Sequence, residues 1–544
     1  MSVSPRDVPQ YRDVTGPGAW RAVLHELAAT VPAPDPRARP RYRTILMPML
    51  VGASDLFAVR EGLLAHALRL RGAEVVFVLC DGMTACDART YDHDPDGYCA
   101  QCLAHGEANL AAFGHRVLRA SAHADLERAG ACAALARARA DEQLLQDAPG
   151  RPGLAAHVFS STLRYLRAGV WAPSDARTVA KGREYLETAL LMREFAQTTI
   201  ARVRPDKVVL SHGVYATWGP WADQAVAAGV PFDTCCGGWR RNTLFLQHDD
   251  PRALHCDDLW PDVAHHPLDA NERACIEAYI STRDDNRADA FQYIQGIEQG
   301  LASFCARHAI DRTTTRRIVG VFSNVAFDSA RFGGGRAFAD MFAWLRACVE
   351  RARLHPDTLF VVKAHPGEAN FVESTPEAWR VGAALASSSA LPPNVRFVPP
   401  DDRVSPYALY ALIDAGLVNT SSVGLEMALH GIPVLTTGAG VHYEKPGIVV
   451  VPRDTDDYFA KFDAFARGPV TFTPDRELAL RYAYALYFRK SMPFEPIDVK
   501  GWAPVGLGIR HLGDLAPGRF PGLDRLCEGI LEGTAFAMPG SLRQ

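Results

Sequence analysis

The stretch Asn419-Thr-Ser-Ser-Val-Gly-Leu-Glu-Met-Ala-Leu-His-Gly-Ile-Pro-Val434 decides the fold of the second half of this chain. It follows a mostly apolar run, Ala411 to Val418, which predicts a buried strand, and its paired hydroxyls and glycine predict a turn. A short helical pattern comes next, and Gly431-Ile-Pro433 leads into another apolar strand. Such a strand, turn and helix N-terminus predict an anion site, because unpaired backbone N–H groups and the helix dipole point at one place.

The side chains of this stretch indicate what kind of anion would bind. Ser421 and Ser422 offer hydroxyl donors beside the predicted helix N-terminus, and Gly424 follows them in the turn. Glu426, about one helical turn further on, is spaced to reach a sugar hydroxyl next to a bound phosphate. The stretch therefore predicts a cradle for a nucleotide sugar. The alternative is structural: the serines cap the helix, and Glu426 faces solvent.

Size and composition are those of a soluble protein with more than one domain. The chain has 544 residues, of which 48% are hydrophobic and 22% charged, with a net charge of −4. Without a basic stripe, nucleic acid is not an expected partner. The sequence has no apolar run of about 18 residues and no signal-peptide pattern, so we expect a cytoplasmic protein. A lipid-linked acceptor would bring it transiently to the inner face of the membrane.

Four of the twelve cysteines are clustered, and they predict either a metal site or free thiols. Cys80, Cys86, Cys99 and Cys102 have the spacing C-x5-C-x12-C-x2-C. In a chain without an export signal such a cluster favours metal over disulfides, and thiolates suit structural zinc or an iron–sulfur centre. His93 or His105 would be able to replace one thiolate. Buried or redox-active free thiols are the alternative, because the spacing matches no standard zinc finger.

The first half predicts a parallel sheet. A buried strand at Thr44–Val51, an amphipathic helix at Phe57–Arg71 and a second strand at Glu74–Leu79 form a βαβ unit. The cysteine cluster follows the second strand, where open α/β sheets carry their functional loops. Further along we expect helices at 107–139, 180–202 and 218–228, strands at 206–210 and after residue 231, and loops across 247–275.

The second half repeats this pattern, with strands expected at 317–322, 358–362 and 395–398 and a helix at 336–353. Two similar units joined in mid-chain predict an α/β fold of the GT-B type, two facing Rossmann-like parallel-sheet domains with a cleft between them. We expect an N-terminal helix and linker at 1–40, an acceptor domain at 41–300 with a cysteine insertion at 80–105, a donor domain at 310–470, and helices at 471–544 that either cross back to the first domain or pack on their own.

A second group of candidate ligand contacts follows the predicted strand at 358–362. Lys363, His365, Pro366 and Glu368 lie within six residues. A cation, an imidazole and an acid at a strand end suit contacts to a diphosphate and to a base or ribose. The alternative is a surface lysine and a histidine bonded within the protein.

A third candidate is the glycine-bearing loop Ser323–Gly335, which follows the strand at 317–322. Glycines let the backbone approach a phosphate closely, and Asn324 lies at the start of the loop. Alone this is a weak signal, since a flexible surface loop has the same composition.

The His-Pro-x-Glu sequence after a strand, and Ser-Ser-x-Gly-x-Glu-x4-Gly-x-Pro-Val about fifty residues later, resemble the capsule polysaccharide biosynthesis glycosyltransferases. These are GT-B enzymes that include capsular Kdo transferases. The resemblance covers most of the chain and is strongest from about 316 to 495. It implies that His365 and Pro366 contact the donor nucleotide, Ser421 and Ser422 its phosphate, and Glu426 a ribose. Bacterial sialyltransferases share the His-Pro and serine pairing, but this chain shows no clear acid-acid-Gly motif of their kind.

The general base is expected from the first domain, facing the donor across the cleft. His212 is the first choice, because it follows a predicted strand and precedes Gly213, and Asp55, in the loop after the first strand, is the second. A histidine bonded to backbone and an aspartate that caps a helix are the structural alternatives. The resemblance implies that transfer itself needs no cofactor.

Together these features predict a glycosyltransferase that moves a sugar from a nucleotide-activated donor to a saccharide or another surface-glycan or secondary-metabolite acceptor. Its partners would be the nucleotide sugar and a glycan or small-molecule acceptor. Two alternatives remain. A CDP-polyol phosphotransferase of the teichoic-acid type has a similar pattern, although those enzymes generally carry an acid where this chain has Asn419-Thr420. A non-catalytic sugar-nucleotide-binding subunit is the other.

Overall fold

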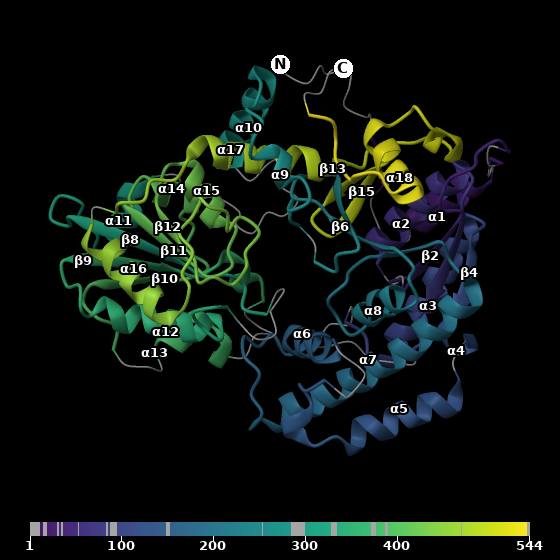
Figure 1. Cartoon of the computed structure of the whole chain (residues 1–544), viewed down its shortest axis with the longest axis horizontal. Coiled ribbons are helices and arrows are strands. Elements are labelled where there is room, and N and C mark those ends of the chain that lie inside the picture. Colours follow the sequence, from purple (N-terminus) through teal and green to yellow (C-terminus); the bar gives the residue numbers. More distant parts are fainter. Residues whose placement is uncertain are drawn as a thin grey trace.

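The computed structural model describes residues 11–14, 19–29, 32–33, 36–49, 51–52, 54–82, 85–87, 95–123, 125–147, 153–252, 254–283, 300–327, 335–371, 377–386, 390–468 and 470–540. Two sheets, each flanked by helices, lie in the two lobes that Figure 1 shows. The lobe coloured purple to blue holds most of the first half of the chain, the green lobe holds the second sheet, and the yellow C-terminal segment lies beside the first lobe.

The first sheet has the strand order β13-β7-β6-β5-β2-β3-β4. Its central strands pair in parallel, as expected for apolar runs that are buried on both faces. β7 and β13 add antiparallel pairs at one side. The strands are β2 (Thr44–Pro48), β3 (Glu74–Leu79), β4 (Arg116–Arg119), β5 (Lys207–Leu210), β6 (Phe232–Gly237), β7 (Thr243–His248) and β13 (Met492–Pro493).

Helix α2 (Asp55–Leu70) connects β2 to β3 and confirms the predicted βαβ unit. It is buried along almost its whole length, because α3 (Pro95–Ala112) and α18 (Pro521–Glu532) pack against it. Three of its buried residues, Arg60, Glu61 and His66, are therefore polar groups inside a core. The other helices of this half are α1 (Ala19–Ala28), α4 (Ala120–His123), α5 (Leu126–Ala138), α6 (Leu154–Leu166), α7 (Ala176–Val203), α8 (Gly219–Ala227), α9 (Trp260–Val263), α10 (Ala270–Arg283) and α11 (Leu301–Arg307).

Two parts of the first half differ from the prediction. The stretch 107–139 is not one helical region, because β4 lies inside it and pairs in parallel with β3. The stretch 247–275 is not all loop, since it contains α9 and the start of α10.

The second sheet has the order β10-β9-β8-β11-β12, and all its pairs are parallel. Its strands are β8 (Arg317–Phe322), β9 (Thr358–Lys363), β10 (Val395–Val398), β11 (Ala415–Val418) and β12 (Val434–Leu435). Its helices are α12 (Met341–Ala352), α13 (Val381–Ala386), α14 (Pro406–Tyr410), α15 (Val423–Leu429) and α16 (Thr455–Arg467), with short 3-10 turns η2 (Pro366–Phe371) and η3 (Glu377–Trp379). The predicted α/β fold with two Rossmann-like parallel-sheet units is confirmed.

After the second sheet the chain returns to the first. Helix α17 (Arg476–Tyr484) continues as a π-helical turn, η4 (Ala485–Lys490), and β13 then pairs with β7 of the first sheet. A small third sheet has the order β1-β15-β14, formed by β1 (Arg12–Asp13), β15 (Ala503–Leu507) and β14 (Ile497–Lys500). The domain limits given above remain a prediction.

A side-chain contact also joins the two halves, since Lys445 Nζ lies 2.6 Å from Asp257 Oδ1. Within the described part of the chain, no helix has the length and apolar character needed to span a membrane.

Candidate functional site

The strand order of the second sheet reverses between β8 and β11. From β8, the chain first adds β9 and β10 on one side and then crosses to add β11 and β12 on the other. In open α/β sheets, ligands bind outside the carboxyl ends of the strands at such a reversal. Asn324 lies just past β8, and Ser421 and Ser422 lie just past β11. The structure therefore brings these predicted residues to one edge of one sheet.

Hydrogen bonds fix the loops at this edge. Ser323 Oγ accepts a bond from the backbone N–H of His365 (2.9 Å), which ties the loops after β8 and β9. The Thr437 hydroxyl donates to Asn419 Oδ1 (2.7 Å), which ties the loops after β11 and β12. Asn324 Oδ1 is buried and accepts no hydrogen bond within the described residues. An unsatisfied buried acceptor at a strand end is suited to a ligand donor.

His365 is a neutral imidazole at this edge. The backbone N–H of Gly367 donates to its Nδ1 (3.0 Å), so the ring proton of the neutral form lies on Nε2. Burial, together with the charge of Lys363, lowers the pKa of His365 to about 4. The neutral ring therefore carries one N–H donor and no charge.

Lys363 and Glu368 are both held by backbone groups. Lys363 is 2% exposed, and its Nζ donates to the carbonyl oxygen of Pro399 (2.9 Å). Burial lowers the pKa of this amine to about 8. Glu368 Oε2 accepts the N–H of Val381 (3.1 Å) at the start of α13, and burial raises the pKa of Glu368. The lysine is thus not the surface residue of the structural alternative.

Glu426 is buried, at 5% exposure, and does not face solvent as the structural alternative would have it. Its Oε1 lies 3.0 Å from Arg283 Nη2, and its Oε2 accepts a hydrogen bond from the Tyr410 hydroxyl (3.1 Å). Arg283 ends α10, and its guanidinium carbon lies 5.0 Å from the centre of the Tyr487 ring. Sequence reasoning missed Arg283 and Tyr410, which come from other helices.

The turn before α15 differs from the helix cap of the structural alternative. Ser422 occupies the N-cap position, but its side chain makes no capping hydrogen bond. The Tyr443 hydroxyl instead donates to the carbonyl oxygen of Ser421. A Cβ at Gly424 would collide with the Tyr443 ring, so this position requires glycine. The Ser422 hydroxyl is therefore not used for capping.

His212 lies at the corresponding point of the first sheet, where the strand order reverses between β2 and β5. Its ring centre lies 5.3 Å from that of Trp218, 5.8 Å from that of Tyr215 and 6.5 Å from that of Phe57. Burial, together with the charges of two arginines, Arg164 and Arg60, lowers the pKa of His212 to about 3. The imidazole is therefore neutral at ordinary pH, and its low pKa makes it a weak proton acceptor in the absence of a bound ligand.

Asp55 is exposed at the first position of α2, and Ser54 holds the N-cap position. Asp55 is therefore not the cap that the structural alternative proposed. An acid in the first turn interacts favourably with the helix dipole.

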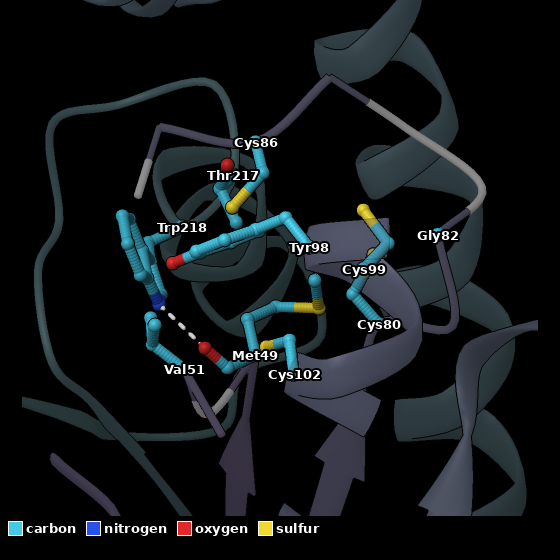
Figure 2. A pocket seen from close by; sticks show the side chains of 10 residues that line it. All are labelled: Met49, Val51, Cys80, Gly82, Cys86, Tyr98, Cys99, Cys102, Thr217 and Trp218. Carbon is cyan, nitrogen blue, oxygen red and sulfur yellow. Dashed lines mark hydrogen bonds between the residues drawn. The ribbon is translucent and has the colours of Figure 1, made fainter. Parts of the chain in front are cut away.

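The predicted metal site at Cys80, Cys86, Cys99 and Cys102 is not supported. Figure 2 shows the four residues around a small cavity of about 20 Å³, together with Met49, Tyr98 and Trp218. A structural zinc site needs four ligand atoms at about 2.0–2.3 Å from one point. Within the described part of the chain, no group of three or more His, Cys, Asp or Glu residues is placed to hold a metal. His93 lies outside the described residues.

Comparison with known proteins gives similar structures but no family. No family model matches the sequence, and no curated protein matches it. A KpsC β-Kdo 2,4-transferase of Thermosulfurimonas dismutans is 15% identical, covering 53% of this chain and 80% of its own, with a TM-score of 0.34. An α,α-trehalose 6-phosphate synthase of Burkholderia multivorans is 13% identical over 81% of this chain and 95% of its own, with a TM-score of 0.30.

A UDP-GlcNAc 2-epimerase of Neisseria meningitidis, solved with UDP-GlcNAc bound, is 11% identical over 81% of this chain and 96% of its own, with a TM-score of 0.25. These structures include a transferase of the kind that the sequence resembles. Similarity at this level does not determine function, which has to be inferred from the side chains described above.

Proposed function

We propose that the protein is a glycosyltransferase that holds a nucleotide-activated sugar at the carboxyl edge of the second sheet and an acceptor on the first. One observation carries this proposal. The predicted donor residues, read from separate stretches of sequence, lie past β8, β9 and β11, around the point where the strand order reverses. The proposed donor contacts are Asn324, Lys363, His365, Pro366, Ser421, Ser422 and Gly424.

Glu368 and Glu426 belong to this site in a different way. Both carboxylates accept hydrogen bonds from protein groups, Glu368 from Val381 and Glu426 from Tyr410. We assign them the role of holding the loops that contact the donor. A ribose hydroxyl would have to share Glu426 with Arg283.

The proposed reaction uses His212 as general base. The acceptor hydroxyl oxygen attacks the anomeric carbon, the bond from that carbon to the phosphate oxygen breaks, and the neutral imidazole takes the hydroxyl proton. The nucleoside phosphate leaves with the bonding electrons. Hydrogen-bond donors around it, including His365 and the serine hydroxyls, stabilise the developing charge. Asp55, at the neighbouring strand end, is the second candidate for the base.

A nucleotide that binds this site should raise the melting temperature, by an amount that corresponds to about 2.7 kcal/mol at a hundred times its Kd. We expect one of CMP, CDP, UDP, GDP and TDP to do so in a thermal-shift series. His365→Ala should weaken that effect, and His265→Ala, at an exposed position of the first half, should not. If no nucleotide shifts the wild-type protein, the donor site is wrong. If only CDP-polyols are turned over, the phosphotransferase alternative is correct.

The affinity for that nucleotide should fall by a few fold as the pH rises past 8. Lys363 is charged below its pKa of about 8 and neutral above it, so its attraction for a phosphate is lost at high pH. Calorimetric titrations at pH 6.5 and pH 9 would measure the change. Lys363→Met should bind weakly at both pH values, and Lys363→Arg should lose the pH dependence. An unchanged pH dependence in Lys363→Met would exclude this role.

A further inference from the structure

Arg60 is a buried arginine with unsatisfied hydrogen-bond donors. It is 5% exposed, and its Nε and Nη2 are buried without a hydrogen-bond partner in the described part of the chain. Its guanidinium carbon lies 4.9 Å from the centre of the Phe57 ring. The Phe57 ring centre in turn lies 6.5 Å from that of His212, which follows β5, so the guanidinium lies near the carboxyl end of that strand; its charge also lowers the pKa of His212. Arg60 therefore points to the part of the first sheet that carries His212.

Glu61, the acidic neighbour of Arg60, does not fully satisfy the charge and hydrogen-bond donors of the guanidinium. Glu61 Oε1 lies 3.5 Å from Arg60 Nη2, which is an ion pair without a hydrogen bond. The same oxygen of Glu61 accepts a hydrogen bond from Ser211 Oγ (2.6 Å). Burial raises the pKa of Glu61, which weakens its ability to balance the guanidinium charge. A buried guanidinium needs hydrogen-bonded anionic partners to offset its desolvation.

A second arginine, Arg164, also lies near His212, because it contacts Tyr215. Arg164, on α6, donates from Nη1 to the Tyr215 hydroxyl (3.0 Å), and its guanidinium carbon lies 4.9 Å from the centre of the Tyr215 ring. The rings of Phe57 and Tyr215 are both edge-on to His212. Each of the two arginines is thus held against an aromatic ring that packs near the proposed base. Arg164 is more exposed than Arg60.

We propose that Arg60 and Arg164 bind an anionic group of the acceptor, a carboxylate or a phosphate, beside His212. The assignment of that anion to the acceptor rests on the proposed function, but anion binding itself does not. Guanidinium groups suit both anions, because their planar N–H pairs match two oxygens at once. Under this proposal the acceptor is an acidic sugar or a phosphorylated molecule rather than a neutral glycan.

Anion binding would also help the base. The two arginine charges add to the effect of burial in keeping the pKa of His212 low, at about 3. A bound anion offsets those charges and raises the pKa, which makes the imidazole a stronger proton acceptor. The acceptor would thus improve its own deprotonation, and an acceptor without the anionic group would react more slowly even when bound.

The test uses the full chain and three probes at constant ionic strength: inorganic phosphate, glucuronate and neutral glucose. We expect phosphate or glucuronate, but not glucose, to raise the melting temperature of the wild-type protein. Arg60→Gln and Arg164→Gln should each weaken this binding at least tenfold. Arg346→Gln, at an exposed position of α12, is the matched control and should behave as wild type. Whichever of phosphate and glucuronate binds more tightly identifies the anionic group.

A donor-site variant separates this site from the nucleotide site. The anion effect should persist in His365→Ala and the nucleotide effect should persist in Arg60→Gln. If His365→Ala abolishes the phosphate effect, phosphate binds at the donor edge and the inference is wrong. It is also wrong if the anions bind Arg60→Gln and Arg164→Gln as they bind wild type. Should Arg60→Gln fail to fold, Arg164→Gln decides alone. Failure of every nucleotide with a normal anion effect would reject only the proposed function.

Discussion

Replacing His212 by alanine is expected to lower turnover by about 10²–10⁴-fold, the usual contribution of a general base, and to leave nucleotide affinity unchanged. Nucleotide affinity should not change because His212 lies away from the proposed donor contacts. His212 follows β5 in the first sheet, whereas the proposed donor contacts follow β8, β9 and β11 in the second. With a pKa of about 3, His212 stays neutral from pH 5 to pH 8, so it contributes no acid limb to kcat/KM of the free enzyme in that range. Steady-state kinetics with the identified donor would measure both effects.

A control is needed because the His212 ring packs against Trp218 and Tyr215. His212→Gln keeps a polar side chain of similar length without a basic nitrogen, and it should lose turnover as the alanine variant does. Asp55→Asn should retain turnover if His212 is the base. Loss of turnover in Asp55→Asn alone would transfer that role to Asp55. Full turnover in both variants would remove general-base catalysis by these residues from the mechanism.

Much of the fold could be predicted from the sequence because buried parallel strands have a distinctive sequence pattern. Their burial on both faces produces continuous apolar runs such as Glu74–Leu79 and Arg317–Phe322, and these runs are strands in the structure. The edge strand β4 (Arg116–Arg119) was missed because it is short, has arginine at both ends and lies among helical residues. These residues form a strand because they pair with β3, and the local sequence does not indicate that pairing.

The candidate site was predictable for the same reason, but only in part. Residues that directly follow parallel strands meet at one sheet edge, so Asn324, His365 and Ser421 could be grouped before their geometry was known. Arg60 and Arg283 lie on helices, and a helical arginine has no sequence pattern that distinguishes a buried position from a solvated one. The partners of a buried charge are set by tertiary packing, which spacing along the chain does not encode.

For the cysteine cluster, the sequence predicted more than the structure supports. Its spacing predicted shared ligation, and the structure does place Cys80, Cys86, Cys99 and Cys102 around one cavity. Proximity to a common space is a weaker condition than tetrahedral ligation, which fixes both distances and directions. The sequence could therefore indicate that the four residues gather but not that they bind a metal.

Replacing Glu426 by alanine is expected to lower the free energy of unfolding by about 3–5 kcal/mol, the usual effect of removing one partner of a buried ion pair. Glu426 and Arg283 have side chains that are 6% and 9% exposed, and the variant would leave the Arg283 charge buried without its carboxylate. The Tyr410 hydroxyl would lose its acceptor as well. Urea denaturation of wild type and variant would measure the loss, with an unchanged m value as the sign of an intact fold.

A double-mutant cycle distinguishes this structural role from a direct contact with ribose. Arg283→Met removes the buried charge but keeps an apolar side chain beside Tyr487, so Glu426→Ala should destabilise that variant much less than it destabilises wild type. A coupling of 1 kcal/mol or more, roughly, would establish the ion pair as the main partner of Glu426. If the single variant instead keeps wild-type stability and loses nucleotide affinity, the ribose contact implied by the family resemblance is correct. The ion pair then has to open when the donor binds, because one carboxylate cannot give its full hydrogen-bonding capacity to Arg283, Tyr410 and a ribose at once.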